Sequence, residues 1–278
     1  MNIVNILEEI EKVDGEIYER LNPRRSAMKD FYNMGKKVAL AAMPLALGSM
    51  FTKAYGQSTP TAVVDVLKFA LTLEYLEFHF YNHAVEAAPG LIVGATPLAA
   101  IKTIRDHEKA HVALLRGALG EAAAGAALPY SAFDFTAGGT FADVYTNYDT
   151  FLAVAQAFED TGVRAYKGQA PVLKGLDVLT VALQIHSVEA RHAAHIRTMR
   201  AGRGAKIKPW ISLGMGGSAN DTGIGAVDPV YKGEDADVQA GITITGIATG
   251  VTKAAAVESF DEFLTKAEVL AIAGLFIK

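Results

Sequence analysis

The chain contains no cysteine, and that absence excludes several kinds of chemistry. Disulfide bonds, thiolate metal sites and haem attached through cysteine are ruled out, so any bound metal must be held by oxygen and nitrogen ligands. An iron module of the rubredoxin type, which needs four thiolates, is excluded for the same reason.

Charge is also scarce. Only 20% of the 278 residues are charged, 51% are hydrophobic, and the formal net charge is −4. Such a chain can bury one large core, or one core and a smaller appendage. The slightly acidic balance, and the lack of a basic stripe interleaved with aromatic residues in the central region, exclude nucleic acid as a partner.

One short pattern occurs twice between residues 71 and 195. A lone glutamate is followed 34 residues later in the first copy, and 30 in the second, by Glu-x-x-His. The lone glutamates are 85 residues apart and the two Glu-x-x-His copies 81 residues apart, which indicates an internal repeat. The residues of the pattern are Glu74, Glu108 and His111, then Glu159, Glu189 and His192.

The spacing within each Glu-x-x-His is that of a chelating pair. Residues three apart on a helix project from nearly the same face, so the carboxylate and the imidazole aim at one point. A four-helix bundle can build a two-metal site from one Glu on each of two helices and Glu-x-x-His on each of the other two. Because these glutamates lie in strongly apolar runs, where an unpaired carboxylate is costly, a metal site is favoured over surface Glu and His on amphipathic helices.

Other polar residues near the pattern have plainer interpretations. Tyr81 and Tyr166 follow the lone glutamates by seven residues and return to the same helical face, so both should line the interior as ordinary core. Glu77 is either an extra ligand or a solvated glutamate at the bundle edge, and the second is favoured. Asp106 and Asp160 are candidates for the hydrogen-bond partner that a metal-bound imidazole needs.

The remaining histidines are expected at the surface or as partners of ligands, not as ligands. They are His79, His83, His107, His186 and His195.

Four helices are predicted in a bundle over residues 58–201. Ser58-Thr59-Pro60 is a helix start signal, and Pro89-Gly90 ends the first periodic apolar run. Small and turn-forming residues mark the crossover between the two halves. The three later helices are expected over 98–120, 140–167 and 171–201, and the crossover over 121–139.

Residues 1–57 are predicted to form an N-terminal helix followed by a segment similar to an export signal. Arg24-Arg25, an apolar run and Ala54-Tyr55-Gly56 resemble a twin-arginine signal with its cleavage site, although Ala27 stands where an aromatic residue is expected. A periplasmic or exported protein and a cytoplasmic one, whose apolar run packs on the bundle, are both left open. The run is short and contains Pro44, so no integral membrane span is expected.

Residues 202–278 are predicted to form a long irregular extension. The first part is rich in Gly, Asp and Ser without helical period, and its glycines are not spaced as a phosphate loop. The last part, residues 258–278, has helical periodicity and an apolar end. We expect it to form an amphipathic helix that docks on the bundle.

The stretches LEYLEFHFY, IRDHEKAH, FED and VEARH together resemble the ferritin-like superfamily of carboxylate-bridged di-metal proteins. The resemblance is closest to the bacterial ferritin-like family that includes desiccation-related proteins. It implies an all-α, ferritin-like four-helix bundle that binds two transition-metal ions, and iron and manganese both suit such ligands. The missing thiolate module disfavours a true rubrerythrin. By resemblance the metal ligands are Glu74, Glu108, His111, Glu159, Glu189 and His192, with Glu108 and Glu189 bridging.

The resemblance leaves three functions open. One is an oxidoreductase, similar to a peroxidase or a manganese catalase, that acts on peroxide or oxygen and protects against oxidative or drying stress. Another is a metal-binding protein without fast turnover. The third is a structural stress or surface protein whose metal only stabilises the bundle. Neither the substrate, nor the metal, nor assembly into a homo-oligomer follows from the sequence.

Overall fold

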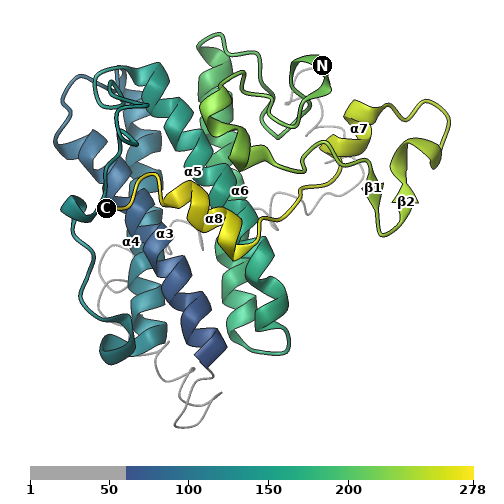
Figure 1. The fold of residues 1–278 in the computed structure, drawn as a ribbon. Coiled ribbons are helices and arrows are strands. Elements are labelled where there is room, and N and C mark those ends of the chain that lie inside the picture. The colour runs from purple at the N-terminus through teal and green to yellow at the C-terminus, as the bar shows by residue number, and fades with distance from the viewer. Residues whose placement is uncertain (1–60) are drawn as a thin grey trace, which may run out of the picture. The chain divides into compact units, whose positions relative to one another are not determined.

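A computed structural model describes residues 61–278. The predicted N-terminal helix and export signal, residues 1–57, lie outside this range. Four long helices form the body of the described part (Figure 1). They are α3 (Thr61–Glu86), α4 (Ala95–Ala124), α5 (Tyr148–Gln169) and α6 (Val178–Gly202). Helix α3 packs along α4 and α5 along α6, and contacts between α3 and α5 and between α4 and α6 close the bundle. The prediction of an all-α four-helix bundle is confirmed.

Helix α5 begins at Tyr148, later than the predicted start at residue 140. The segment before it consists of turns in which Gly138 and Gly139 have φ of 64° and 97°, values that a helix interior does not allow. Asn147 then caps the helix by accepting a hydrogen bond from the Asp149 backbone N–H at 3.0 Å. The predicted start was therefore wrong, because the helix begins at its cap, Asn147, and not at the beginning of the apolar run.

The other helix boundaries also differ slightly from the prediction. Helix α4 continues to Ala124, but its backbone leaves the helical region at Gly120, the predicted end. A short 3-10 turn (Ala170–Leu173) precedes α6, which therefore begins at Val178 and not at residue 171.

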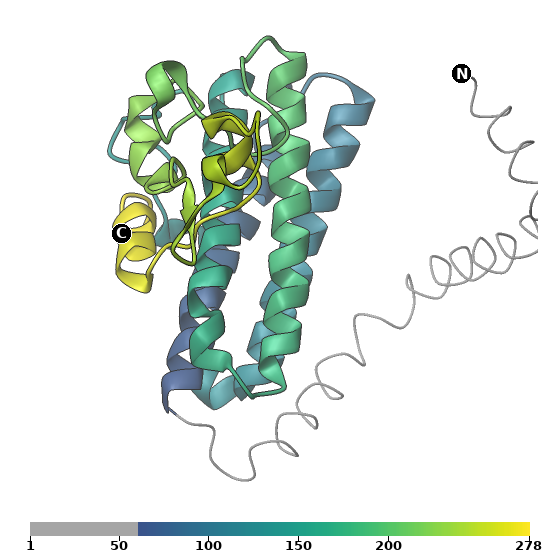
Figure 2. The same cartoon turned by 90° about the vertical axis from the view of Figure 1, so that its right-hand side faces the viewer.

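The C-terminal extension forms only short elements. They are a two-stranded antiparallel pair, β1 (Val238–Gln239) and β2 (Ile242–Thr243), and two helices, α7 (Lys253–Glu258) and α8 (Lys266–Ala273). Thr265 and Glu268 form a capping box at the start of α8, so the predicted single helix over 258–278 is shorter than expected. Figures 1 and 2 show that the extension lies along one side of the bundle.

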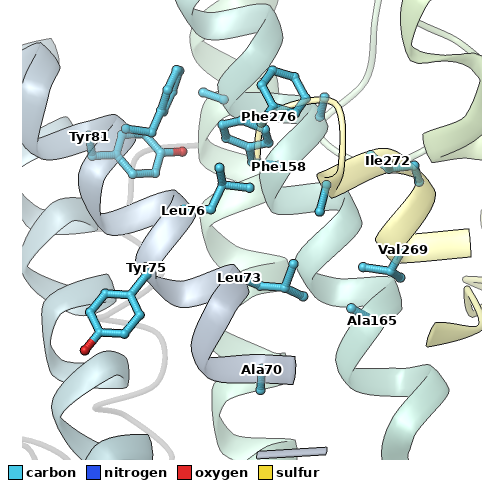
Figure 3. Packing of buried hydrophobic residues seen from close by; sticks show 14 of the residues in the cluster. Ala70, Leu73, Tyr75, Leu76, Tyr81, Phe158, Ala165, Val269, Ile272 and Phe276 are labelled. Atoms are coloured by element: carbon cyan, nitrogen blue, oxygen red, sulfur yellow. The ribbon is translucent and has the colours of Figure 1, made fainter. Parts of the chain in front are cut away.

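An aromatic core joins the end of the chain to the bundle. The rings of Phe80 on α3 and Phe151 on α5 stack at 4.8 Å between centroids, and Phe158 meets Phe80 edge-on at 5.0 Å. Phe276, just after α8, packs edge-on against Phe158 with 4.7 Å between ring centroids. Figure 3 shows these two rings together with Ile272 of α8. Such pairs add to the burial of apolar area. The expected docking of the C-terminal segment on the bundle is confirmed.

Two buried arginines fasten the extension to α5 and α6. Arg197 pairs with Asp160 of α5 and with Asp221 of the extension, at 2.7 Å in each case. Arg164 donates to the carbonyl oxygen of Glu262 at 2.9 Å and pairs with Glu234 at 2.9 Å. Both guanidinium groups are shielded from solvent, so these ion pairs hold the extension on the bundle through groups that cannot be left unpaired.

None of the helices within residues 61–278 is long and apolar enough to cross a membrane. The apolar run around Pro44, for which the sequence predicts no integral membrane span, lies outside the described residues.

Candidate metal centre

The six residues of the repeated pattern meet inside the bundle. All six side chains are buried, because the apolar face of each helix on which they lie points to the interior. They form two groups that share Glu108 and Glu189, and within each group one atom of every residue lies within 4.8 Å of the others. The first group is Glu74, Glu108, His111 and Glu189, and the second is Glu108, Glu159, Glu189 and His192.

The two shared carboxylates each present one oxygen to each imidazole. Glu108 places Oε2 at 3.0 Å from Nδ1 of His111 and Oε1 at 2.9 Å from Nδ1 of His192. Glu189 places Oε1 at 3.1 Å from the first of these nitrogens and Oε2 at 3.7 Å from the second. This arrangement places both carboxylates between the two groups, where each could bridge two ions.

The lone glutamates complete the groups from the other helices. Glu74 on α3 places Oε2 at 3.1 Å from Nδ1 of His111. Glu159 on α5 places Oε2 at 3.3 Å from Nδ1 of His192. Each imidazole nitrogen therefore faces three carboxylates.

Several of these buried atoms make no hydrogen bond within the described residues. They are Glu108 Oε1, Glu159 Oε2, both oxygens of Glu189, and His192 Nδ1. Some lie close enough to one another for ion pairing, but their angles are not those of a hydrogen bond. Leaving a buried polar group unsatisfied costs about 1 to 3 kcal/mol. Oxygen and imidazole nitrogen atoms that converge without partners fit a transition-metal ion.

Burial and close contacts shift the pKa values of the groups in the centre. Burial raises the pKa of Glu159 to about 7, although His192 acts in the opposite direction. Burial and the neighbouring Glu189 also raise the pKa of Glu108 well above its usual range. For His192, burial favours the neutral form, but Glu159 and Glu108 outweigh it and raise the pKa to about 12. Glu189 differs, because its contacts with His111 and His192 overcome burial and lower its pKa to about 2.

Each interior tyrosine orients the lone glutamate of the other half. The hydroxyl of Tyr81 on α3 donates to Oε1 of Glu159 on α5, and that of Tyr166 on α5 donates to Oε1 of Glu74 on α3. Both rings are buried, as expected. The hydrogen bonds leave only Oε2 of each glutamate facing an imidazole, so each lone glutamate is set to offer a metal one oxygen.

Removing either hydroxyl should weaken metal binding in one group only. We expect Tyr81→Phe to weaken the Glu159 group and Tyr166→Phe the Glu74 group, by about 10- to 100-fold, as is typical for partners that orient ligands. Titration with Co²⁺, followed by absorbance, measures both affinities. Tyr75→Phe is the matched control, because this buried tyrosine of α3 instead accepts from Arg116 at 3.0 Å. Unchanged affinities in both variants would contradict the orienting role.

Three expectations for neighbouring residues were wrong. Glu77 is not at a solvated edge: only 3% of it is exposed. Asp106 is exposed and pairs with Arg105, and Asp160 pairs with Arg197, so neither serves a histidine of the pattern. These aspartates lie one or two residues from the pattern, Asp106 before Glu108 and Asp160 after Glu159, but their side chains leave the helix in other directions.

The partner of His192 is His107, one of the histidines expected at the surface or as partners of ligands. Nδ1 of His107 lies 2.9 Å from Nε2 of His192, on the side away from the carboxylates. His107 is four residues before His111, a spacing that places both on one face of α4, although His107 itself is exposed. The imidazole it contacts lies on another helix, and that proximity follows only from the packing of α4 against α6.

The fold and the centre define a class of protein: a helical bundle whose buried Glu and His groups could hold metal ions. A family model described as "Ferritin-like domain" matches residues 62–202, which span all four long helices. The chain belongs to this ferritin-like family, and the resemblance found in the sequence is confirmed at that level. No curated protein and no solved structure shows a significant match.

Proposed function

We propose that the chain binds two transition-metal ions, iron or manganese, and uses them in redox chemistry on peroxide or dioxygen. The observation that carries the proposal is the position of Glu108 and Glu189, each of which turns one oxygen toward His111 and the other toward His192. Carboxylates shared in this way hold two ions close together. A pair of such ions, when bound, supplies the two electrons that reduction of an O–O bond needs.

The residues of the chain would prepare the centre for this chemistry in three ways. The tyrosine hydroxyls fix the lone glutamates, so that no rearrangement is needed when ions bind. Burial of every ligand excludes bulk water, which strengthens the electrostatic interactions inside. Burial and Glu159 raise the pKa of the Tyr81 hydroxyl, so this phenol keeps its proton on the oxygen that faces Glu159.

Protection against oxidative or drying stress is the physiological role that this proposal favours, and it rests on the family resemblance. The alternatives are a metal-binding protein without turnover and a structural protein whose metal only stabilises the fold. All three roles use the same ligands, and they differ in what the loaded protein does to peroxide.

The decisive experiment loads metal-free protein separately with iron and manganese and follows the consumption of hydrogen peroxide. Elemental analysis should give two ions per chain, and fewer in His111→Ala and His192→Ala. The control is Glu86→Gln, an exposed position on α3. Two bound ions without peroxide turnover would replace the enzymatic role by the metal-binding or structural one. A wild-type chain that binds no ion would overturn the proposal entirely.

Metal loading should also release protons. The pKa of Glu108 is raised, and those of Glu159 and His192 are raised to about 7 and about 12, so protons occupy the metal-free centre at neutral pH. An ion displaces them, because ligands bind in their deprotonated forms. We expect the apparent affinity to fall as the pH falls through about 7. Calorimetric titration in two buffers of different ionisation enthalpy measures the release, and equal heats in both buffers would count against it.

A further inference from the structure

Glu77 is a fifth carboxylate beside the candidate centre. It lies on α3 one turn after Glu74, and 3% of it is exposed. It belongs to neither of the two groups of four. Among the described residues none donates a hydrogen bond to its side chain, and after burial the groups that raise its pKa are carboxylates, with Glu189 and Glu159 first. A carboxylate in such a position is costly unless a cation or a donor compensates it.

Gly162 on α5 provides the space in which Glu77 lies. A Cβ atom at this position would be 3.3 Å from Oε1 of Glu77 and 3.6 Å from Oε2 of Glu189. Both oxygens thus lie close to one point above the glycine. The second of them is the oxygen of Glu189 that faces His192, so Glu77 reaches toward the second group.

The glycine is not required by the backbone. It lies in the middle of α5 and, unlike Gly138, does not have a positive φ. Glycine inside a helix costs about 0.5 to 1 kcal/mol relative to alanine. What glycine contributes at this position is therefore the absence of a side chain.

The two halves of the repeat differ at the position of Glu77. Gly162 follows Glu159 by three residues, as Glu77 follows Glu74, so the glycine stands where the second half would carry its own copy of Glu77. One half supplies the additional carboxylate and the other half supplies the room for it.

The electrostatic environment agrees with this placement. Burial is the main cause that raises the pKa of Glu77, and among its neighbours Glu189 and Glu159 act more strongly than Glu74 of the same helix. This order agrees with the contact beside Gly162, where Oε1 of Glu77 and Oε2 of Glu189 lie close to the same point.

We propose that Glu77 is a seventh metal ligand, which binds the ion of the Glu159 and His192 group across the gap left by Gly162. This inference rests on the proposed function. It makes the two ions of a nearly symmetric repeat unequal, because one is held by residues of the six-ligand pattern alone and the other gains a carboxylate from α3.

The test is Co²⁺ titration of the full chain, read by absorbance and by calorimetry. The wild type should bind two ions with different affinities. Glu77→Gln should weaken the tighter ion by about 10- to 100-fold, the size found when partners of a metal site are removed, and leave the other unchanged. Gly162→Ala should shift the same ion in the same direction, since its Cβ would lie 3.3 Å from Oε1 of Glu77 and press the carboxylate away from its position. The control is again Glu86→Gln.

A mutant cycle assigns the ion. If Glu77 serves the second group, Glu77→Gln should couple with Glu159→Gln and add simply to Glu74→Gln. Wild-type titration curves in folded Glu77→Gln, or coupling to Glu74 in place of Glu159, would overturn the inference while the proposed function stands. Absence of metal from the wild type would instead defeat the proposed function itself. Glu77→Gln keeps the size and shape of the side chain and removes a buried acidic group, so it keeps the test available if Gly162→Ala does not fold.

Discussion

Glu108→Gln should abolish most of the stabilisation that metal gives the protein. An ion that binds only the folded state stabilises it by about 2.7 kcal/mol at a hundredfold excess over Kd. Two ions at about that value, and about 2 to 4 °C per kcal/mol for a chain of this size, raise the melting temperature by about 10 to 20 °C. Because Glu108 contributes one oxygen to each group, its amide variant weakens both sites at once.

Melting curves followed by circular dichroism, with chelator and with excess Mn²⁺, measure the effect. Glu74→Gln should lose only about half of the rise, because Glu74 belongs to one group. Glu121→Gln, an exposed position on the same helix as Glu108, should lose none. Without metal, Glu108→Gln should melt close to the wild type, because burial and Glu189 raise the pKa of Glu108 and favour its neutral form, which the amide resembles in size and shape. A full metal-dependent rise in Glu108→Gln would refute the shared position of this residue.

Arg197→Met should destabilise the protein by about 3 to 5 kcal/mol, since breaking a buried ion pair leaves the partner charge uncompensated. Here two carboxylates would be left, those of Asp160 and Asp221, both buried. The hydroxyl of Tyr231 donates to Asp160 at 2.7 Å, but a neutral donor cannot replace the lost charge. The methionine keeps an apolar stem of similar reach, so lost packing contributes little.

Urea denaturation of metal-free protein measures the loss without interference from the metal centre. Arg203→Met is the matched control, because Arg203 also pairs with an aspartate, Asp149, but at the surface, where such a pair contributes about 0 to 1 kcal/mol. Adding Asp160→Asn and Asp221→Asn to Arg197→Met should recover part of the stability. If Arg197→Met unfolds within about 1 kcal/mol of the control, the buried pairs do not secure the extension on the bundle.

Sequence patterns located the parts of the fold that depend on local geometry. A spacing of three residues fixes a helical face, so the sequence alone was enough to place Glu108 and His111 side by side. The spacing of seven likewise predicted that Tyr81 and Tyr166 face inward. The start of α5 was misplaced because the cap at Asn147, a short polar signal, was outweighed by the apolar run around it.

Contacts between helices could not be read in the same way. Oε1 of Glu77 lies beside Gly162, where an added Cβ would be 3.3 Å away, and this glycine lies on a different helix. Asp160 was assigned to a histidine because it adjoins Glu159 in sequence, but its partner is Arg197 of α6. In each case the decisive neighbour is set by how two helices pack, and single-helix periodicity carries no information about it.

Tyr81 and Tyr166 each contact the lone glutamate of the other half, and this exchange has a consequence for how such a centre can arise. The hairpin of α3 and α4 has its own Glu74, Glu108 and His111, but it borrows Glu189 to complete its group and Tyr166 to orient Glu74. The hairpin of α5 and α6 borrows Glu108 and Tyr81 in return. A single ancestral hairpin would have possessed this donor set only as a pair of identical copies. With both copies in one chain the two halves need not be identical, so a difference such as Glu77 in one half and Gly162 in the other is compatible with the shared centre.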